Sequence, residues 1–384
     1  MFYLLPKWRL LILLVVALAA SWLVFRPTLK IALGKNIVDD PQARKLQNRP
    51  VPILGGVVVF FGIAVGLMFF KTVFYQTALL PVLAASIIML YVGTIDDILD
   101  IAPAKRLLIE TLVAVLMVFG SRCHILNPQG LFGLEEIPTG VAIPLTVLTI
   151  VGIVNAINMI DGIDGLLPGL GITMLGFLGV LCFLAHDYSN AALAVVTIGS
   201  LTTFFLHNVF GKKSKMFLGD GGSMLLGNII SWLVIRILSG QFHITAYLGG
   251  IFDFNLMTFC VAVLGIPVFD ALRVMFTRIA KHRSPFHADK NHLHHLFIAC
   301  GFSHLETTLS IMSAAFLIVV IYLAAWMLGA SAELQFAIAL LLAFAFDFGC
   351  AALLRRLSHK KTIPAQKRMS GKISSAISDF VDKY

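Results

Sequence analysis

Apolar runs of about twenty residues recur along this chain of 384 residues, and they limit its fold more than any other feature. Hydrophobic residues make up 59% of the sequence and charged residues 13%, with a mean hydropathy of +0.92. Soluble domains are far more polar, so the composition predicts an all-α polytopic membrane protein. We expect about eleven transmembrane helices. Their approximate ranges are 10–27, 53–70, 77–95, 106–121, 139–157, 166–185, 190–209, 221–239, 256–275, 305–328 and 332–354.

The basic residues predict how these helices are oriented. If successive loops alternate between the two sides of the membrane, all but five of the 29 Lys and Arg residues fall on one side. Because positively charged loops remain in the cytoplasm, the N-terminus is expected to be periplasmic and the C-terminus cytoplasmic. The same topology accounts for most of the net charge of +9, and nothing favours nucleic-acid binding. The five Lys and Arg residues that do not fall on the cytoplasmic side are Lys7, Arg9, Lys71, Arg122 and Arg236.

We expect one transmembrane domain over residues 1–354 and a basic cytoplasmic tail over residues 355–384. The cytoplasmic loops are expected near residues 30–52, 96–106, 158–165, 210–220 and 276–304. A cleaved signal peptide is the alternative for the first apolar run, but that run continues past the Ala17–Ala19 triplet. The five cysteines are scattered without a C-x-x-C pair, which is typical of packing residues.

Acidic residues cluster at the ends of the apolar runs. Asn158, Asp161 and Asp164 recur every three residues, so they share one face of a helix. Asp96 and Asp97 end an earlier run in the same way. One isolated Asp can simply mark where a helix leaves the bilayer. Two clusters that face the same compartment predict a shared polar site.

A glycine-rich turn supplies a further carboxylate. Asp220 follows Gly219 and precedes a glycine pair at the expected start of a helix. Glycines let the backbone approach a ligand, and the exposed N–H groups of a helix start favour anions, although glycine pairs also serve helix packing. Together with Asp97 and with Asp161 or Asp164, this carboxylate predicts hard oxygen ligands for Mg²⁺ or Mn²⁺.

A histidine-rich loop is the second concentration of polar residues. Five of the eleven histidines lie between His282 and His295. A zinc site, a phosphate-binding loop and a merely solvated loop are the three alternatives. Structural zinc commonly uses Cys ligands, and the nearest cysteine is the single Cys300, so His and Arg donors directed at phosphate oxygens are favoured.

Other polar residues within the runs receive structural interpretations. Asp270 and Arg273, one turn apart, are expected to neutralise each other. Asp347 and Glu110 have no evident partner in the sequence. Arg236 is expected to extend towards the membrane interface.

Four motifs together resemble those of the polyprenyl-phosphate N-acetylhexosamine-1-phosphate transferases. They occupy residues 93–97, 155–166, 217–222 and 292–295, and the resemblance runs in order from Asp39 to His295. Residues 38–45, 51–56 and 284–286 look most like the WecA branch of this family. That branch transfers GlcNAc-1-phosphate from UDP-GlcNAc to undecaprenyl phosphate. The MraY branch typically carries a different His triplet and a Pro-Thr-Met-Gly-Gly motif, and both are absent here.

The resemblance implies a multi-pass transferase of the bacterial inner membrane with its active site on the cytoplasmic face. The implied reaction releases UMP and initiates synthesis of lipopolysaccharide O-antigen or a related surface polysaccharide. UDP-GlcNAc, undecaprenyl phosphate and the lipid bilayer are the implied partners, with Mg²⁺ or Mn²⁺ as cofactor, and a homodimer is left open. The implied catalytic residues are Asp96, Asp97, Asp161 and Asp164, and the implied metal ligands are Asp220 and Asp97. The implied substrate-binding residues are Asp39, Asn155, Asn158, Asp161, Phe217, Arg278, His292, His294 and His295.

Two alternatives to this reaction remain. A sister enzyme would use another UDP-HexNAc, such as a 6-deoxy sugar or UDP-MurNAc-pentapeptide. A nucleotide-sugar transporter would place polar groups near the bilayer midplane, often within internal repeats. Because the acids gather at one side and no repeat is evident, the sequence favours an enzyme. Direct attack and a covalent phospho-enzyme on an Asp both stay open.

Overall fold

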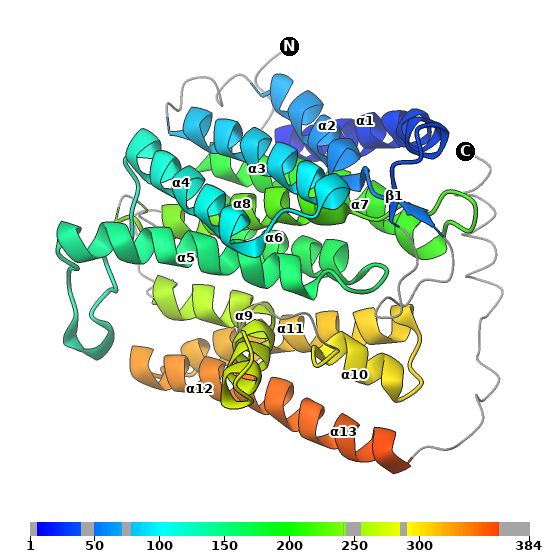
Figure 1. Ribbon diagram of the computed structural model, residues 1–384. Coiled ribbons are helices and arrows are strands. Elements are labelled where there is room, and N and C mark those ends of the chain that lie inside the picture. The colour runs from blue at the N-terminus through cyan, green and yellow to red at the C-terminus, as the bar shows by residue number, and fades with distance from the viewer. Residues whose placement is uncertain are drawn as a thin grey trace.

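The computed structural model describes residues 6–39, 50–70, 78–240, 242, 255–284 and 290–360. Within these ranges the chain is mostly helical, as the sequence predicts (Figure 1). It also has one two-stranded ladder, which the sequence did not predict. Motif positions 40–45 and 285–286 and the tail beyond residue 360 lie outside the described residues. The helices are α1 (Pro6–Gly34), α2 (Gly55–Met68), α3 (Leu79–Leu99), α4 (Pro103–Ser121), α5 (Thr139–Ile160), α6 (Leu166–Leu184), α7 (Tyr188–Phe210), α8 (Gly219–Leu238), α9 (Leu256–Ala280), α10 (Leu293–Ala299), α11 (His304–Met327), α12 (Ala332–Phe344) and α13 (Cys350–Lys360). The shorter elements are β1 (Val38–Asp39), β2 (Val51–Pro52), the 3₁₀ turn η2 (Leu131–Gly133) and the π-helical turn η3 (Ala345–Gly349).

Each of the eleven expected apolar runs forms a helix, and nine helices of the described chain are long and apolar enough to cross a membrane. The two exceptions have physical reasons. With 14 residues, α2 is short; at about 1.5 Å per residue it extends only about 21 Å, less than the roughly 30 Å hydrocarbon core. The second exception, α4, carries Lys105, Arg106 and Glu110 within its first half. The last run is continuous through α12, η3 and α13.

The most buried helix of the bundle is α8. It contacts α2, α3, α5, α6 and α9, and 94% of its apolar stretch is buried. A helix that is apolar on all sides belongs in the interior, and this pattern explains why α8 is surrounded. The outer helices α1, α11 and α12 expose many of their apolar side chains, as helices that face lipid do.

Glycines bring α2 and α3 unusually close to the start of α8. A Cβ atom on Gly56 would lie 2.5 Å from the backbone nitrogen of Gly222. A Cβ atom on Gly93 would lie 2.5 Å from the backbone oxygen of Asp220. Small residues at such crossings let helix backbones touch inside a membrane protein. As a result, the acidic end of α3 lies beside Asp220.

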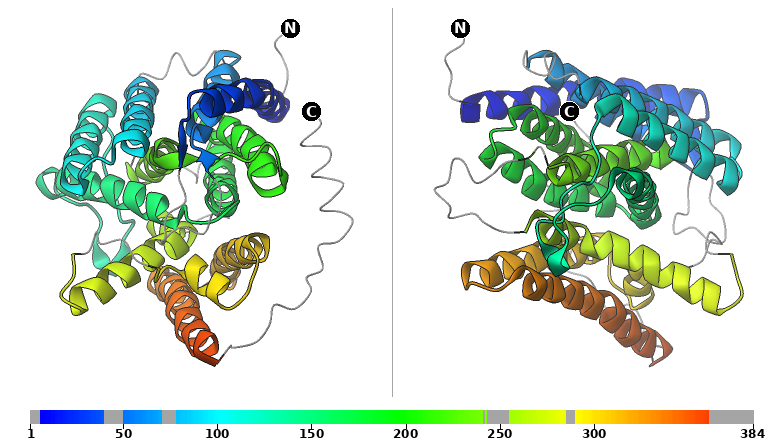
Figure 2. Two further views of the ribbon diagram at one scale, coloured as in Figure 1. Left: turned by 45° about the vertical axis from the view of Figure 1, so that its right-hand side comes forward. Right: turned by 90° about the vertical axis from the view of Figure 1, so that its left-hand side faces the viewer.

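Helices α9 to α13 pack together along one side of the bundle (yellow-green to orange-red in Figures 1 and 2). There α9 contacts α5, α11 and α12, and α10 contacts α13. The ends of α3, α5 and α7 and the starts of α4, α6, α8 and α11 meet at one end of the molecule. This meeting point holds the polar residues that the sequence singles out.

Candidate active site

The helix ends surround a cavity of about 1150 Å³. Its wall is built from segments that are far apart in the sequence, including β1, the α3–α4 and α5–α6 connections and the start of α8. Most of the site residues expected from the sequence line it: Asp39, Asp96, Asp97, Asn158, Asp161, Asp164, Phe217, Asp220 and His295. The expected residues that do not line it are Asn155, Arg278, His292 and His294.

Backbone hydrogen bonds hold the segment before α8 in place. The Phe217 N–H donates to the carbonyl of Pro52 (2.7 Å), and the Gly55 N–H donates to the carbonyl of Phe217 (3.0 Å). Pro52 itself belongs to β2, where Val51 pairs with Asp39 of β1. The 51–56 motif therefore fixes both Asp39 and Phe217 at the wall of the cavity.

Gly219 allows Asp97 and Asp220 to lie together. Its φ of +75° is a left-handed conformation that favours glycine. A Cβ atom there would lie 2.5 Å from Asp97 Oδ2. The N–H of Gly221 donates a long hydrogen bond (3.4 Å) to the same Asp97 oxygen. The glycine-flanked carboxylate thus results from close packing against α3.

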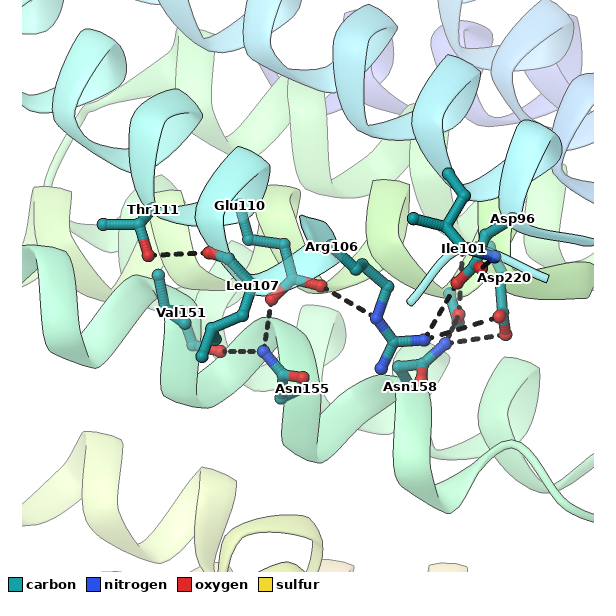
Figure 3. Close-up of polar contacts among 11 residues, drawn as sticks. Asp96, Ile101, Arg106, Leu107, Glu110, Thr111, Val151, Asn155, Asn158 and Asp220 are labelled. Carbon is teal, nitrogen blue, oxygen red and sulfur yellow. Dashed lines mark hydrogen bonds and ion pairs between the residues drawn. The ribbon is translucent and has the colours of Figure 1, made fainter. Parts of the chain in front are cut away.

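Arg106 is the cation of the acidic cluster, and the sequence did not single it out. Its Nη1 lies 3.1 Å from Asp96 Oδ2 and 3.6 Å from Asp220 Oδ2, and its Nε lies 3.4 Å from Glu110 Oε1 (Figure 3). Asn155 in turn donates a hydrogen bond to Glu110. Glu110 therefore has two partners, and the expectation that it has none is wrong. Its position one turn after Arg106 was the available signal.

Asn158 joins α5 to the start of α8. Its Nδ2 donates to Asp220 Oδ1 (2.9 Å) and to Ser223 Oγ (2.8 Å). One turn further, Asp161 follows the end of α5. Removal from water, followed by the nearby charges of Asp220 and Asp164, raises the pKa of Asp161 to about 8. Near neutral pH, Asp161 is therefore mostly a neutral carboxyl that can donate a hydrogen bond.

Asp164 has the opposite environment. Burial acts to raise its pKa, but the His304 and Lys215 contacts outweigh burial and hold the pKa below its usual value. His304 Nδ1 lies 2.6 Å and Lys215 Nζ lies 2.7 Å from Asp164 Oδ2. The Lys215 ammonium also lies 5.6 Å from the centre of the Phe217 ring. Lys215 and His304 both line the cavity and were not assigned from the sequence.

The histidine-rich loop divides between the cavity and the interior. His295 lines the cavity, whereas His292 Nδ1 lies 2.8 Å from the buried Asp270 Oδ2. His294 is almost fully buried and packs against Gly162. Burial, with the neighbouring His295 and His292, keeps the pKa of His294 well below its usual value. It is therefore a neutral ring at neutral pH.

Ion pairs involve three groups of polar residues within the helices. Asp270 and Arg273 do pair, at 2.6 Å. Asp347 is not without a partner, because its Oδ2 lies 2.8 Å from Arg273 Nε. Arg236, in the last turn of α8, has a partner, because its Nε lies 2.9 Å from Asp187 Oδ2 at the start of α7. The partner of Asp347 sits on another helix, α9.

Among the described residues, no three His, Cys, Asp or Glu side chains gather in a geometry that holds a metal without further ligands. Asp97 and Asp220 nevertheless offer only oxygen donors and lie within the cavity wall. Mg²⁺ is commonly held through one or two carboxylates together with substrate phosphates and water. The residues present fit a metal of that kind and do not form a complete protein cage.

The sequence is similar to that of a known protein family. The sequence model of glycosyl transferase family 4 matches residues 79–238, which run from the first residue of α3 to the last residue of α8. The undecaprenyl-phosphate alpha-N-acetylglucosaminyl 1-phosphate transferase of Pasteurella multocida is 32% identical over 311 residues, covering 80% of this chain and 84% of the relative. Proteins of the same name from Salmonella typhi and Escherichia coli (strain K12) are 29% and 28% identical. They cover 74% and 75% of this chain, and 76% of each relative is aligned.

Proposed function

The chain belongs to glycosyl transferase family 4, and from this premise we propose that it transfers GlcNAc-1-phosphate from UDP-GlcNAc to undecaprenyl phosphate. In this reaction an oxygen of the lipid phosphate forms a bond to the β-phosphorus of UDP-GlcNAc. The bond between that phosphorus and the bridging oxygen breaks, and the bridging oxygen keeps the electron pair. UMP leaves, and undecaprenyl-diphosphate-GlcNAc remains.

The observation that carries this proposal is the convergence of Asp96, Asp97, Asp220 and Arg106 on one cavity at the helix ends. Small-molecule sites typically have volumes of roughly 300–1000 Å³. At about 1150 Å³ the cavity has room for a nucleotide sugar together with the phosphate head of a lipid. Its position at the helix ends suits a reaction between a soluble donor and an acceptor held in the bilayer.

The acidic cluster and Arg106 suit the transfer step. The guanidinium offers charge-assisted hydrogen bonds to phosphate oxygens, and these bonds favour the approach of two anionic substrates. Asp96 accepts hydrogen bonds from Arg106 and from the Ile101 N–H (2.7 Å), and these bonds fix the position of Arg106. Asp97 then orients the attacking lipid phosphate or takes its proton. A Mg²⁺ or Mn²⁺ ion held by Asp220 and Asp97 would supply positive charge to the diphosphate and to the leaving UMP.

A neighbouring part of the cavity wall suits the nucleotide. The Phe217 ring offers a face for the uracil, and the neutral Asp161 carboxyl can donate a hydrogen bond to it. Asn158 joins this wall to Asp220. His295 lines the cavity and is assigned to the diphosphate and sugar. Direct substrate contact by Arg278, His292 and His294 stays a prediction, since these side chains do not line the cavity.

We place the cavity on the cytoplasmic face of the bacterial inner membrane. The basic residues on the loops at this end support that orientation through the positive-inside rule. UDP-GlcNAc is a soluble, charged molecule, so it reaches only a site that opens to the compartment where it is made. The phosphate of the lipid acceptor lies at the membrane surface and reaches the same helix ends.

The test of substrate identity uses the purified protein in vesicles that contain undecaprenyl phosphate. UDP-GlcNAc, a UDP-6-deoxy-HexNAc and UDP-MurNAc-pentapeptide are each supplied with a label in the sugar. The proposal expects labelled lipid from UDP-GlcNAc at a kcat/KM at least about tenfold above the others, equivalent to about 1.4 kcal/mol. A better rate with another donor would reassign the sugar, and transport of unchanged UDP-GlcNAc without labelled lipid would refute an enzyme.

The metal assignment has a separate test. Chelator should abolish transfer, and Mg²⁺ or Mn²⁺ should restore it. Asp220→Asn should lower kcat by about a hundredfold or more and weaken Mn²⁺ binding measured by electron paramagnetic resonance without substrate. Asp187→Asn is the matched control, because Asp187 is also an acid that lies close to an arginine but does not line the cavity. Full activity in chelator, or unchanged Mn²⁺ binding in Asp220→Asn, would contradict the assignment.

A further inference from the structure

A buried ionic network joins the last membrane helix to α9. Arg273 lies between two acids: its Nη2 is 2.6 Å from Asp270 Oδ1 and its Nε is 2.8 Å from Asp347 Oδ2. All three side chains are at most 3% exposed. None of them lines the cavity, so the acidic site already described does not explain them.

The network also holds backbone of the histidine segment, defined as residues 290–299. Arg273 Nη2 donates to the carbonyl of Asn291 (3.0 Å), and the Leu293 N–H donates to Asp270 Oδ1 (3.0 Å). With the contact between His292 and Asp270, three successive residues are tied to the two side chains of α9. Neutralising charge between two helices needs none of these backbone bonds. They fix the position at which α10 begins.

The histidine segment in turn shapes the cavity. Lys290 and His295 flank the anchored residues, and both line the cavity wall. His294 packs against Gly162, next to Asp161. A shift of the start of α10 would therefore move the Lys290 and His295 side chains relative to the acids on α3 and α8.

Asp347 lies within the π-helical turn η3 when it contacts Arg273. In a regular α-helix each residue turns the chain by about 100°, and a π turn inserts an extra residue. Asp347 is fully buried, while Phe344 and Phe348 on either side are 48% and 37% exposed. Within this segment the Asp347 carboxylate lies inside the bundle, and the stacked rings of Phe344 and Phe348 lie partly outside. Such turns recur at functional positions.

We propose that Asp347 is a positioning residue that holds the histidine segment against the active-site cavity through Arg273. The last membrane helix thereby contributes to donor binding without touching the donor. This inference rests on the proposed function, because it assigns the histidine segment to the diphosphate and sugar of UDP-GlcNAc. Loss of the Asp347 carboxylate removes one of the two acids that hold the Arg273 side chain. The backbone at Asn291 and Leu293 is then held less firmly.

The test compares Asp347→Ala and Asp347→Asn with Asp187→Ala in the full-length protein in detergent. Asp187 is matched because it pairs with an arginine at 2.9 Å within the bundle, at the start of α7, whose opposite end carries the cavity residue Asn208. Asp347→Ala should raise the KM for UDP-GlcNAc by about tenfold or more while the inhibition constant of UMP changes less than threefold. Amide hydrogen exchange should rise within residues 290–299. Asp347→Asn, which still accepts the Nε hydrogen bond, should lie between wild type and Asp347→Ala.

The control separates positioning from general stability. Asp187→Ala should lower the apparent melting temperature. It should leave unchanged the ratio of the KM for UDP-GlcNAc to the inhibition constant of UMP, and also the amide exchange of the histidine segment. Equal losses of UDP-GlcNAc and UMP binding in Asp347→Ala, or unchanged exchange in residues 290–299, would overturn the inference. If Asp347→Ala does not fold, the same exchange measurement on Asp347→Asn decides. A wild-type protein that fails to use UDP-GlcNAc would refute the proposed function, whereas the exchange comparison would still report on the network.

Discussion

At the scale of single residues, Asp161 and Asp164 show how position decides the charge of a carboxyl. They lie three residues apart, yet burial and neighbouring acids raise the pKa of Asp161 to about 8, whereas His304 and Lys215 lower that of Asp164. A neutral acid and an ionised acid thus face the same cavity. Such divergence between neighbouring carboxyls is typical of sites with distinct proton roles.

The pair predicts opposite effects on stability. A carboxyl with a raised folded-state pKa stabilises the fold below its unfolded value near 3.8 and loses that contribution as the pH rises through about 8. Asp161→Asn should therefore gain apparent melting temperature relative to wild type between about pH 5 and pH 8 and level off above. Asp164→Asn should be less stable than wild type at neutral pH, and its deficit should shrink as the pH falls below the usual Asp value.

Thermal unfolding in detergent with chelator, followed across this pH range, checks both variants. Chelator removes any contribution from a bound cation. A constant difference between Asp161→Asn and wild type from pH 5 to pH 8 would show that Asp161 carries no raised pKa. A deficit of Asp164→Asn that grows at acidic pH would show that the Lys215 and His304 contacts do not stabilise its ionised form.

At the scale of elements, the crossing of α3 over the start of α8 sets the distance between the acids. Gly93 sits at this crossing with the backbone of Asp220 directly against it, so an added Cβ atom has no flexible side chain to displace. Gly152 of α5 is also a helical glycine, but a Cβ atom there would meet nothing within 4 Å. The two glycines therefore provide a matched pair.

Gly93→Ala should separate α3 from α8 and lower transfer activity by about tenfold to a hundredfold, with a loss of about 1–3 kcal/mol from overpacking. Gly152→Ala should keep full activity and gain about 1 kcal/mol from helix propensity. Initial rates and apparent melting temperatures of the two variants measure these effects. Normal activity in Gly93→Ala would show that this crossing does not control the spacing of the acids.

The same elements show what could be predicted from the sequence. Apolar length predicts the helices because the bilayer demands such runs, and the acids at their ends were expected together for that reason. The pairing of Glu110 with Arg106 follows the spacing of one helical turn, but two other contacts were not predictable. Asn155 lies 45 residues from Glu110, and Arg273 lies 74 residues from Asp347. The π turn that contains Asp347 leaves no periodic signal in the sequence. Arg106 was missed because its role depends on which helix ends meet.

At the scale of the whole molecule, the two ends of the bundle differ. One end carries the cavity with its acids and Arg106, and the other carries the buried pair of Asp187 and Arg236. Lys290 lines the cavity. The start of α4 also lies at the cavity, and Arg122 follows the other end of this helix. The proposed orientation thus assigns these two residues to opposite compartments.

Cysteines introduced at Lys290 and Arg122 test this orientation. In intact cells with Cys350 replaced by Ser, a membrane-impermeant maleimide that crosses the outer membrane should label a cysteine at position 122 and leave position 290 unlabelled until the inner membrane is opened. The other native cysteines are buried, so their background is low. Labelling of position 290 in intact cells would place the cavity on the periplasmic side and remove its access to UDP-GlcNAc.

The nucleotide released during turnover tests the central claim most directly. Transfer of GlcNAc-1-phosphate breaks the bond to the β-phosphorus and releases UMP, whereas transfer of the sugar alone would release UDP. The measurement is the amount of each nucleotide formed from UDP-GlcNAc with undecaprenyl phosphate, together with the mass of the lipid product. We expect one UMP for each lipid that has gained GlcNAc-1-phosphate, and neither product without the lipid acceptor. Release of UDP, or a lipid that has gained only the sugar, would contradict the account.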